Sequence, residues 1–205
     1  MPSVHDTYRQ LEARSRAAWR SWLQKHHAVS KGIWLVFQKQ ASEVPSVKYA
    51  EAVEEALCFG WIDSRLHPLD DLRYRQVFTP RKPLSEWSAL NKKRVVQLEA
   101  DGQLRAAGRT AIAVAKANGS WTKIDHVEAG VVPDEMRHAF ARSPIARQRF
   151  EAFSPSARKY ILHWVNNVKS ADKRTERIRL AVQLAGRGLK AHDPRDRAKL
   201  SKPTL

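Results

Sequence analysis

A helix gives way to a strand in the ten residues LCFGWIDSRL, positions 57–66, and this junction decides the fold. Gly60 suits the left-handed position that follows the last turn of a helix, because glycine has no Cβ to clash there. After it, side chains alternate between two faces with the period of two that a β-strand shows. One face carries Trp61, Asp63 and Arg65. We therefore predict a helix before the glycine and a strand directly after it.

The segments around this junction predict an α+β fold. Upstream, residues 49–59 have helical spacing, and residues 33–37 (IWLVF) form the short β-branched and aromatic run of a buried strand. Downstream, residues 74–79 alternate again after a polar loop, which predicts an antiparallel hairpin. The apolar spacing of residues 7–25 predicts a first helix. We expect a small, mostly antiparallel sheet packed with helices.

From Ser85 onward the pattern is all-helical. We expect helices over about 85–100, 104–117, 134–141 and 144–153, followed by an αα-hairpin that begins at Ser154-Pro155. The last residues are charged and hold few large apolar side chains, so we expect them to be flexible. The predicted division is an α+β module at residues 1–125, a helical module at residues 126–190 and a tail at residues 191–205.

Charge is concentrated in the last third of the chain. The formal net charge is +16, and residues 137–205 hold 17 basic against 5 acidic side chains, a surplus of 12. Such a block raises encounter rates with polyanions and says nothing about fold. Two interpretations stay open, a nucleic-acid or anionic-surface partner and a solvated basic face.

Several classes of protein are disfavoured by what the sequence lacks. Cys58 is the single cysteine, so no internal disulfide is possible and a reducing cytoplasm is the expected location. We expect no signal peptide and no membrane span. The eight histidines show no metal-binding spacing and no phosphate loop occurs, so we expect no metal and no cofactor. We interpret Cys58 as a core residue.

The hairpin and the following helix hold the residue types of a small-ligand site. Aromatic walls, one carboxylate and guanidinium donors suit a small polar or anionic ligand. Trp87 and Asn91 are four residues apart, which predicts one helix face. The alternative is a structural Asp–Arg pair beside a core tryptophan. The candidate ligand-binding residues are Trp61, Asp63, Arg65, Thr79, Arg81, Trp87 and Asn91.

The C-terminal hairpin holds a second candidate site. Basic side chains flank its apolar stripes, as phosphate contacts require, although no base-reading residues can be identified. A solvated face is again the alternative. The candidate nucleic-acid-binding residues are Arg158, Lys159, Lys169, Lys173, Arg174 and Arg177.

The same motifs resemble a known family. GIWL (32–35), YAEA (49–52), LCFGWIDS (57–64), FTPR (78–81), SEWS (85–88) and Asn91 are similar to the YdeI/OmpD-associated family, also called bacteriocin-protection proteins. The segment from Pro133 through Ile178 resembles the terminal module of that family. The resemblance implies a bacterial cytoplasmic protein associated with tolerance of bacteriocins or cationic peptides, and it implies no catalytic residues.

Three hypotheses about function follow. The favoured one is a non-enzymatic binding or stress-tolerance protein, with the candidate pocket for a small anionic ligand. The second is nucleic-acid binding through the basic hairpin, which predicts strong salt dependence. The third is an enzyme that uses Asp63 as a base, which a solvated or fully paired carboxylate would argue against. Oligomeric state and ligand identity stay open.

Overall fold

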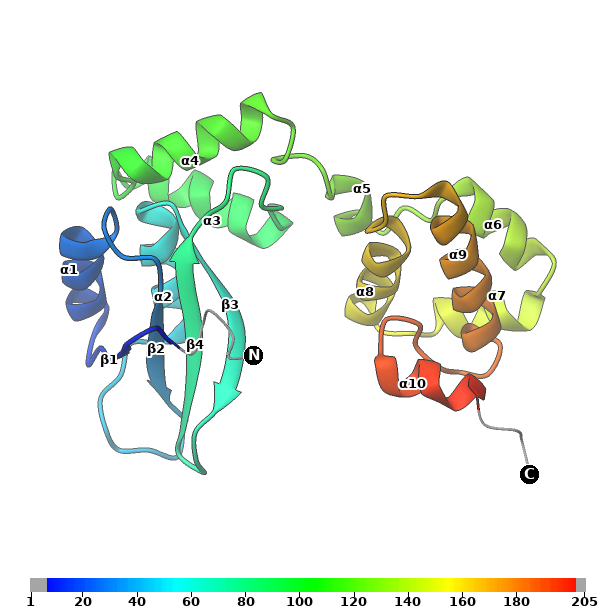
Figure 1. Cartoon of the computed structure of the whole chain (residues 1–205), viewed down its shortest axis with the longest axis horizontal. Helices are drawn as coiled ribbons and strands as arrows, with labels where there is room; N and C mark the ends of the chain where they lie inside the picture. The colour runs from blue at the N-terminus through cyan, green and yellow to red at the C-terminus, as the bar shows by residue number, and fades with distance from the viewer. Residues whose placement is uncertain (1–6, 202–205) are drawn as a thin grey trace. The chain divides into compact units, whose positions relative to one another are not determined.

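The computed structural model describes residues 7–201, which fall in two compact units (Figure 1). The first unit ends at Lys123 and the second begins at Ile124, and each has a hydrophobic core of its own. The first combines a four-stranded sheet with helices and the second is helical, which confirms the predicted α+β class. The elements of the first unit are β1 (Gln10–Glu12), α1 (Arg16–His26), β2 (Ile33–Gln38), α2 (Tyr49–Cys58), β3 (Trp61–Pro68), β4 (Arg73–Pro80), α3 (Ala89–Ala100) and α4 (Ala106–Ala117).

The sheet of the first unit is mixed, with strand order β1-β2-β4-β3. β1 pairs in parallel with β2, and the other two pairings are antiparallel. β3 and β4 form the predicted hairpin, with Asp63 opposite Phe78. The register shifts between Asp63 and Leu66, so the alternation of faces in β3 is interrupted there.

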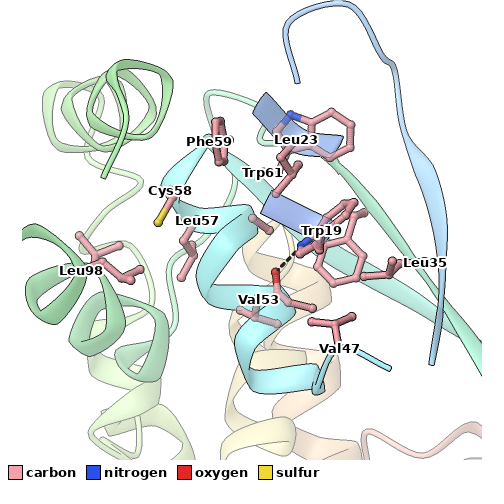
Figure 2. Close-up of a cluster of buried hydrophobic side chains, with 14 of the residues drawn as sticks. Trp19, Leu23, Leu35, Val47, Val53, Leu57, Cys58, Phe59, Trp61 and Leu98 are labelled. Carbon is pink, nitrogen blue, oxygen red and sulfur yellow. Dashed lines mark hydrogen bonds between the residues drawn. The ribbon is translucent and has the colours of Figure 1, made fainter. Parts of the chain in front are cut away.

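Trp19 of α1 joins the sheet to α2. Its ring lies edge-on to Phe78 of β4, with centroids 5.4 Å apart, and its indole Nε1 donates to the carbonyl oxygen of Ala52 at 3.0 Å (Figure 2). The side chain is fully buried, so this donor needs its partner. Leu35, Trp19 and Leu57 are among the largest fully buried side chains of this core.

Two glycines allow the close approach of α2, β3 and α4. Gly60 has a φ of +72°, the left-handed conformation that the sequence predicts between helix and strand. Gly108 lies in α4 where a Cβ would come within 2.5 Å of the carbonyl oxygen of Cys58. Only a residue without a side chain lets the two backbones meet this closely.

A buried ion-pair network connects α1 to α2. Glu55 is 1% exposed and accepts from Arg16 Nε and Arg20 Nη1, both at 2.6 Å. Arg16 also pairs with Glu54, at 2.8 Å. Arg20 Nη2 donates to the carbonyl oxygen of Gln103 at 3.1 Å. Sequence spacing predicts that Glu55 points away from the apolar face of its helix, and this is wrong because two arginines from α1 neutralise it inside.

The second unit is a small helical bundle. Its core contains Met136, Phe140, Phe150, Ile161 and Leu184. The expected αα-hairpin is formed by its two longest helices, which pack on each other. The elements are α5 (Asp125–Glu128), α6 (Asp134–Ala141), α7 (Pro144–Glu151), α8 (Pro155–Asn166), α9 (Ala171–Ala185), α10 (Pro194–Ala198) and the 3₁₀ helix η2 (Lys199–Ser201).

Three local expectations differ from the structure. The helix expected over residues 7–25 is instead the short strand β1 followed by α1, which Ser15 caps. The helix expected from Ser85 begins at Ala89, with Ser88 as its cap. The expected tail contains α10 and η2, and Arg197 lies 5.2 Å from the ring of Trp164, while residues 202–205 lie outside the described residues.

Candidate functional site

Arg81 follows the end of β4 and is held at the junction of the hairpin and the next helix. Its backbone N–H donates to the carbonyl oxygen of Gly60 at 2.9 Å, which continues the hairpin pairing. Its guanidinium lies 3.6 Å from the ring centroid of Trp87, a cation–π contact with a fully buried indole. Nη1 donates to the carbonyl oxygen of Glu86 at 3.2 Å. Backbone and side chain are thus both fixed.

The other side of this guanidinium is uncompensated. Nε and Nη2 of Arg81 are covered from solvent and have no hydrogen-bond partner among the described residues. Burial lowers the pKa of Arg81 to about 10, against the opposing effect of the Asp63 charge. The side chain therefore stays protonated at pH 7. A desolvated cation with two free donors is an unusual group for a folded protein to keep.

A pocket of about 400 Å³ adjoins this arginine. It is lined by Trp61, Arg81 and Trp87 of the candidate set, together with the exposed Lys82. The remaining wall is largely apolar and includes Phe59 and residues of α4. Three of the seven candidate residues are thus brought together around one hollow of ligand size.

Asp63 lies in a separate polar cluster between β3, β4 and α2. Its Oδ2 accepts from the Tyr49 hydroxyl at 2.8 Å and from Gln76 Nε2 at 2.7 Å. Burial and then the neighbouring Asp63 carboxylate raise the pKa of Tyr49 to about 12. No described carboxylate forms an ion pair with Arg81, so Asp63 acts on it only at longer range. Two donors on one oxygen argue against Asp63 as a general base.

The other candidate residues are not part of the pocket lining. Arg65 is exposed and adjoins the register shift in β3. Thr79 pairs with Ile62 and alternates with Phe78, so it faces the sheet surface opposite the core. Asn91 accepts from Arg94 Nη1 at 3.0 Å. Trp87 precedes the cap of α3, so the expectation that it shares a helix face with Asn91 is wrong.

Trp61 is better explained as a core tryptophan than as a ligand-binding residue. Its side chain is 1% exposed, and Nε1 donates to the carbonyl oxygen of His27 at 3.2 Å. Its ring packs edge-on against Trp22, with centroids 5.7 Å apart. Trp61 is therefore a core tryptophan with its polar atom satisfied, and it contributes an apolar wall to the pocket.

Sequence reasoning missed Gln76 and Tyr49. Gln76 is the buried polar residue of β4, and it occupies a core-facing position between Tyr74 and Phe78. A polar residue at an apolar position of an alternating strand is a signal that the sequence does hold. Helical spacing places Tyr49 on the apolar face of its helix, and nothing local in the sequence shows that its hydroxyl meets a carboxylate from β3.

The candidate residues of the C-terminal hairpin are divided between paired and unpaired cations. Lys159 pairs with Glu128 at 2.9 Å, and Arg174 with Glu135 at 2.7 Å. Arg177 donates to the carbonyl oxygen of Asn167 at 3.2 Å and lies 4.7 Å from the ring of Trp164. No hydrogen bond or ion pair is found within the described chain for the side chains of Arg158, Lys169 and Lys173. Nucleic-acid binding by this hairpin stays a prediction.

Residues 7–201 contain neither a metal-binding cluster nor a membrane-spanning helix. No group of three or more His, Cys, Asp or Glu side chains in this range is placed to hold a metal ion. None of its helices combines the length and apolar character needed to cross a bilayer. Cys58 is buried, and burial raises the pKa of its thiol, which disfavours the reactive thiolate.

Two family models match the chain. Residues 11–111 match a domain of unknown function (DUF8412), and residues 129–188 match the family described as bacteriocin-protection, YdeI or OmpD-associated. The motifs from Gly32 to Asn91 lie in the first matched segment, and the candidate hairpin lies in the second. Neither the curated proteins nor the solved structures contain a match. Over residues 129–188, the chain therefore carries a domain of the YdeI/OmpD-associated, bacteriocin-protection family.

Proposed function

We propose that this chain is a non-enzymatic binding protein whose first unit takes a small anion on the guanidinium of Arg81. The observation that carries the proposal is the pair of covered, unpartnered nitrogen atoms on that side chain, Nε and Nη2. A buried donor without a partner costs about 1–3 kcal/mol, and more when the group is charged. Such a group in a folded protein calls for an ordered water or an ion.

The geometry of the two nitrogen atoms selects the ligand chemistry. Nε and Nη2 form one edge of the planar guanidinium, and their two N–H bonds are parallel. Carboxylate, sulfate and phosphate oxygens match such an edge with two hydrogen bonds. Trp87 holds the plane of Arg81 from one side, so the edge is already oriented before a ligand arrives.

Space and charge beside Arg81 favour a small ligand. The adjoining pocket of about 400 Å³ is bordered by a second cation, Lys82. Because Nε and Nη2 are covered, an anion reaches them only after neighbouring side chains move, so we expect association below the diffusion limit. Asp63 does not fill the position, since its Oδ2 is already bound by Tyr49 and Gln76.

The proposal is tested by thermal unfolding with sodium sulfate, phosphate or acetate at constant ionic strength. Six of the seven tryptophans precede residue 124, so tryptophan fluorescence follows the first unit. A ligand that binds only the folded state stabilises it by about 2.7 kcal/mol at a hundredfold excess over Kd. For a unit of this size we expect Tm to rise by roughly 10 °C.

Three variants separate the site from the general basicity of the chain. Arg81→Met should abolish the anion-dependent shift, and Arg81→Lys should lose most of it, because lysine keeps the charge without the two-donor edge. Arg65→Met removes one positive charge from the same hairpin at an exposed position and should keep the full shift. Equal shifts in Arg81→Met and Arg65→Met, or no shift with any of the three anions, would refute the proposal.

The biological setting is part of the same proposal. The description of the family matched by residues 129–188 names bacteriocin protection. We propose a role in stress tolerance in the cytoplasm, where the single buried Cys58 would stay reduced. Anion binding in the first unit is the activity that we assign to the protein in that role.

A further inference from the structure

A second pocket lies in the other unit and is independent of Arg81. It has a volume of about 480 Å³ and is bordered by α5, α6, α7 and α8. Its wall includes the rings of Phe140 and Phe150, whose centroids are 5.0 Å apart, and the side chain of Leu162. All three residues are at least 96% buried in the core of this unit, so the apolar wall is rigid.

Cations dominate the charged part of this pocket. Four basic side chains border it against two carboxylates, those of Glu128 and Glu151, an excess of two positive charges. Three of the cations already have partners. The pairs are Arg137 with Asp134, Arg147 with Glu151 at 2.8 Å, and Lys159 with Glu128 at 2.9 Å.

Breaking these three ion pairs costs little free energy. Arg137 and Arg147 each keep 65% of their side-chain surface exposed, and Lys159 keeps 44%. Ion pairs at such exposure contribute little, because solvent screens them. The fourth cation, Arg158, has no hydrogen bond or ion pair from its side chain within residues 7–201. An incoming anion therefore meets one free guanidinium and others that can turn towards it.

We infer that this pocket binds a small amphipathic anion, an acidic group on an aromatic or aliphatic body, with Arg158 as the recognition residue. The acidic group would accept from the Arg158 guanidinium, and the apolar body would lie on the Phe140 and Phe150 wall. Neutral ligands of the same shape lack the charged contact. Cationic ligands are repelled by the charge excess. The pocket thus combines the two features that distinguish this ligand class.

In the test, the folded full chain is titrated at neutral pH with the fluorescent probe anilinonaphthalene sulfonate. This probe has an aromatic body and one sulfonate. We expect saturable binding of one probe per chain. Arg158→Gln should weaken it about tenfold or more, as loss of one charge-assisted hydrogen bond does. Arg187→Gln is the matched control, because it removes the same charge from an exposed position outside the pocket lining and should leave affinity unchanged. Circular dichroism verifies that both variants are folded.

Two further measurements separate this site from its alternatives. The neutral analogue phenylnaphthylamine should bind at least tenfold more weakly than the sulfonate, and duplex DNA should not displace the sulfonate. Equal affinity of the sulfonate for wild type and Arg158→Gln would overturn the inference. So would tight binding of the neutral probe, or displacement of the sulfonate by duplex DNA with a steep salt dependence, which would indicate a polyanion surface.

Discussion

Replacement of Glu55 by glutamine should destabilise the first unit strongly, although it only replaces a carboxylate with an amide of nearly the same shape. The carboxylate is 1% exposed and accepts two guanidinium hydrogen bonds at 2.6 Å, from Arg16 and Arg20. Glutamine keeps the shape of the side chain and loses the charge. Its amide also turns a donor towards one of the two arginines, where only an acceptor fits.

The size of the effect can be bounded from the structure. Hydrogen bonds to charged groups contribute about 1.5–3 kcal/mol each, and breaking a buried ion pair costs about 3–5 kcal/mol. The side chains of Arg16 and Arg20 stay 34% and 22% exposed, and Arg16 keeps its pair with Glu54. Water and Glu54 thus offset part of the loss. We expect the free energy of unfolding to fall by about 3 kcal/mol.

Urea unfolding followed by tryptophan fluorescence measures this change. With an m-value of about 2 kcal/mol per molar, the midpoint should fall by roughly 1.5 M. Glu54→Gln is the matched control, because Glu54 is 28% exposed and makes one ion pair in the same network, so it should cost about 1 kcal/mol or less. Equal midpoints for the two variants would show that Glu55 does not hold α1 and α2 together.

Two further predictions concern a glycine and a tyrosine. Gly108→Ala should destabilise the first unit by about 1–3 kcal/mol in urea unfolding, since the new Cβ would lie 2.5 Å from the Cys58 carbonyl oxygen, which outweighs the higher helix propensity of alanine. Gly186→Ala, whose Cβ would meet nothing closer than 3.4 Å, should be neutral or stabilising, and a similar loss in both would contradict the packing argument. Tyr49 should ionise near pH 12, so its contribution to stability is complete below pH 10 and is lost as pH rises through about 12. Ultraviolet titration of wild type and Tyr49→Phe measures this step as the difference between the two curves. A difference with its midpoint near pH 10 instead of about 12 would show that burial and Asp63 do not act on the hydroxyl.

Local signals predict much of this fold. Gly60 adopts the positive φ that its place between helix and strand requires. Ser154 caps α8 through its hydroxyl, as the Ser-Pro pair predicts. In both places the decisive interactions lie within a few residues of each other. Sequence patterns report such interactions directly.

Elements set by distant partners could not be found in this way. β1 has only three residues, too few for a period, and it exists because Gln10–Glu12 pairs with Trp34, Leu35 and Val36. Ser85 has the chemistry of a helix cap, but its N–H closes a turn with the carbonyl oxygen of Lys82, and Ser88 caps α3 instead. Pairing with the distant strand β2 decided the first outcome, and a local turn at Lys82 decided the second.

The candidate site shows the same division. The motif around Arg81 stands out in the sequence, as do the tryptophans on either side. Whether Nε and Nη2 of Arg81 have hydrogen-bond partners depends on which residues surround them in the folded chain, and no sequence motif reports that. The second pocket draws Arg137, Arg147 and Arg158 from three helices, so only the folded bundle brings them together.

The central claim is that the covered guanidinium of Arg81 binds an anion through Nε and Nη2. This claim is tested most directly by ¹⁵N NMR of the arginine Nε–Hε groups. Comparison with Arg81→Met assigns the Arg81 signal. We expect its Hε to exchange slowly with water, because Nε is covered, and its resonance to shift saturably when sodium phosphate is added. An Hε that exchanges as fast as those of exposed arginines and a resonance unmoved by phosphate, sulfate or acetate would contradict the account.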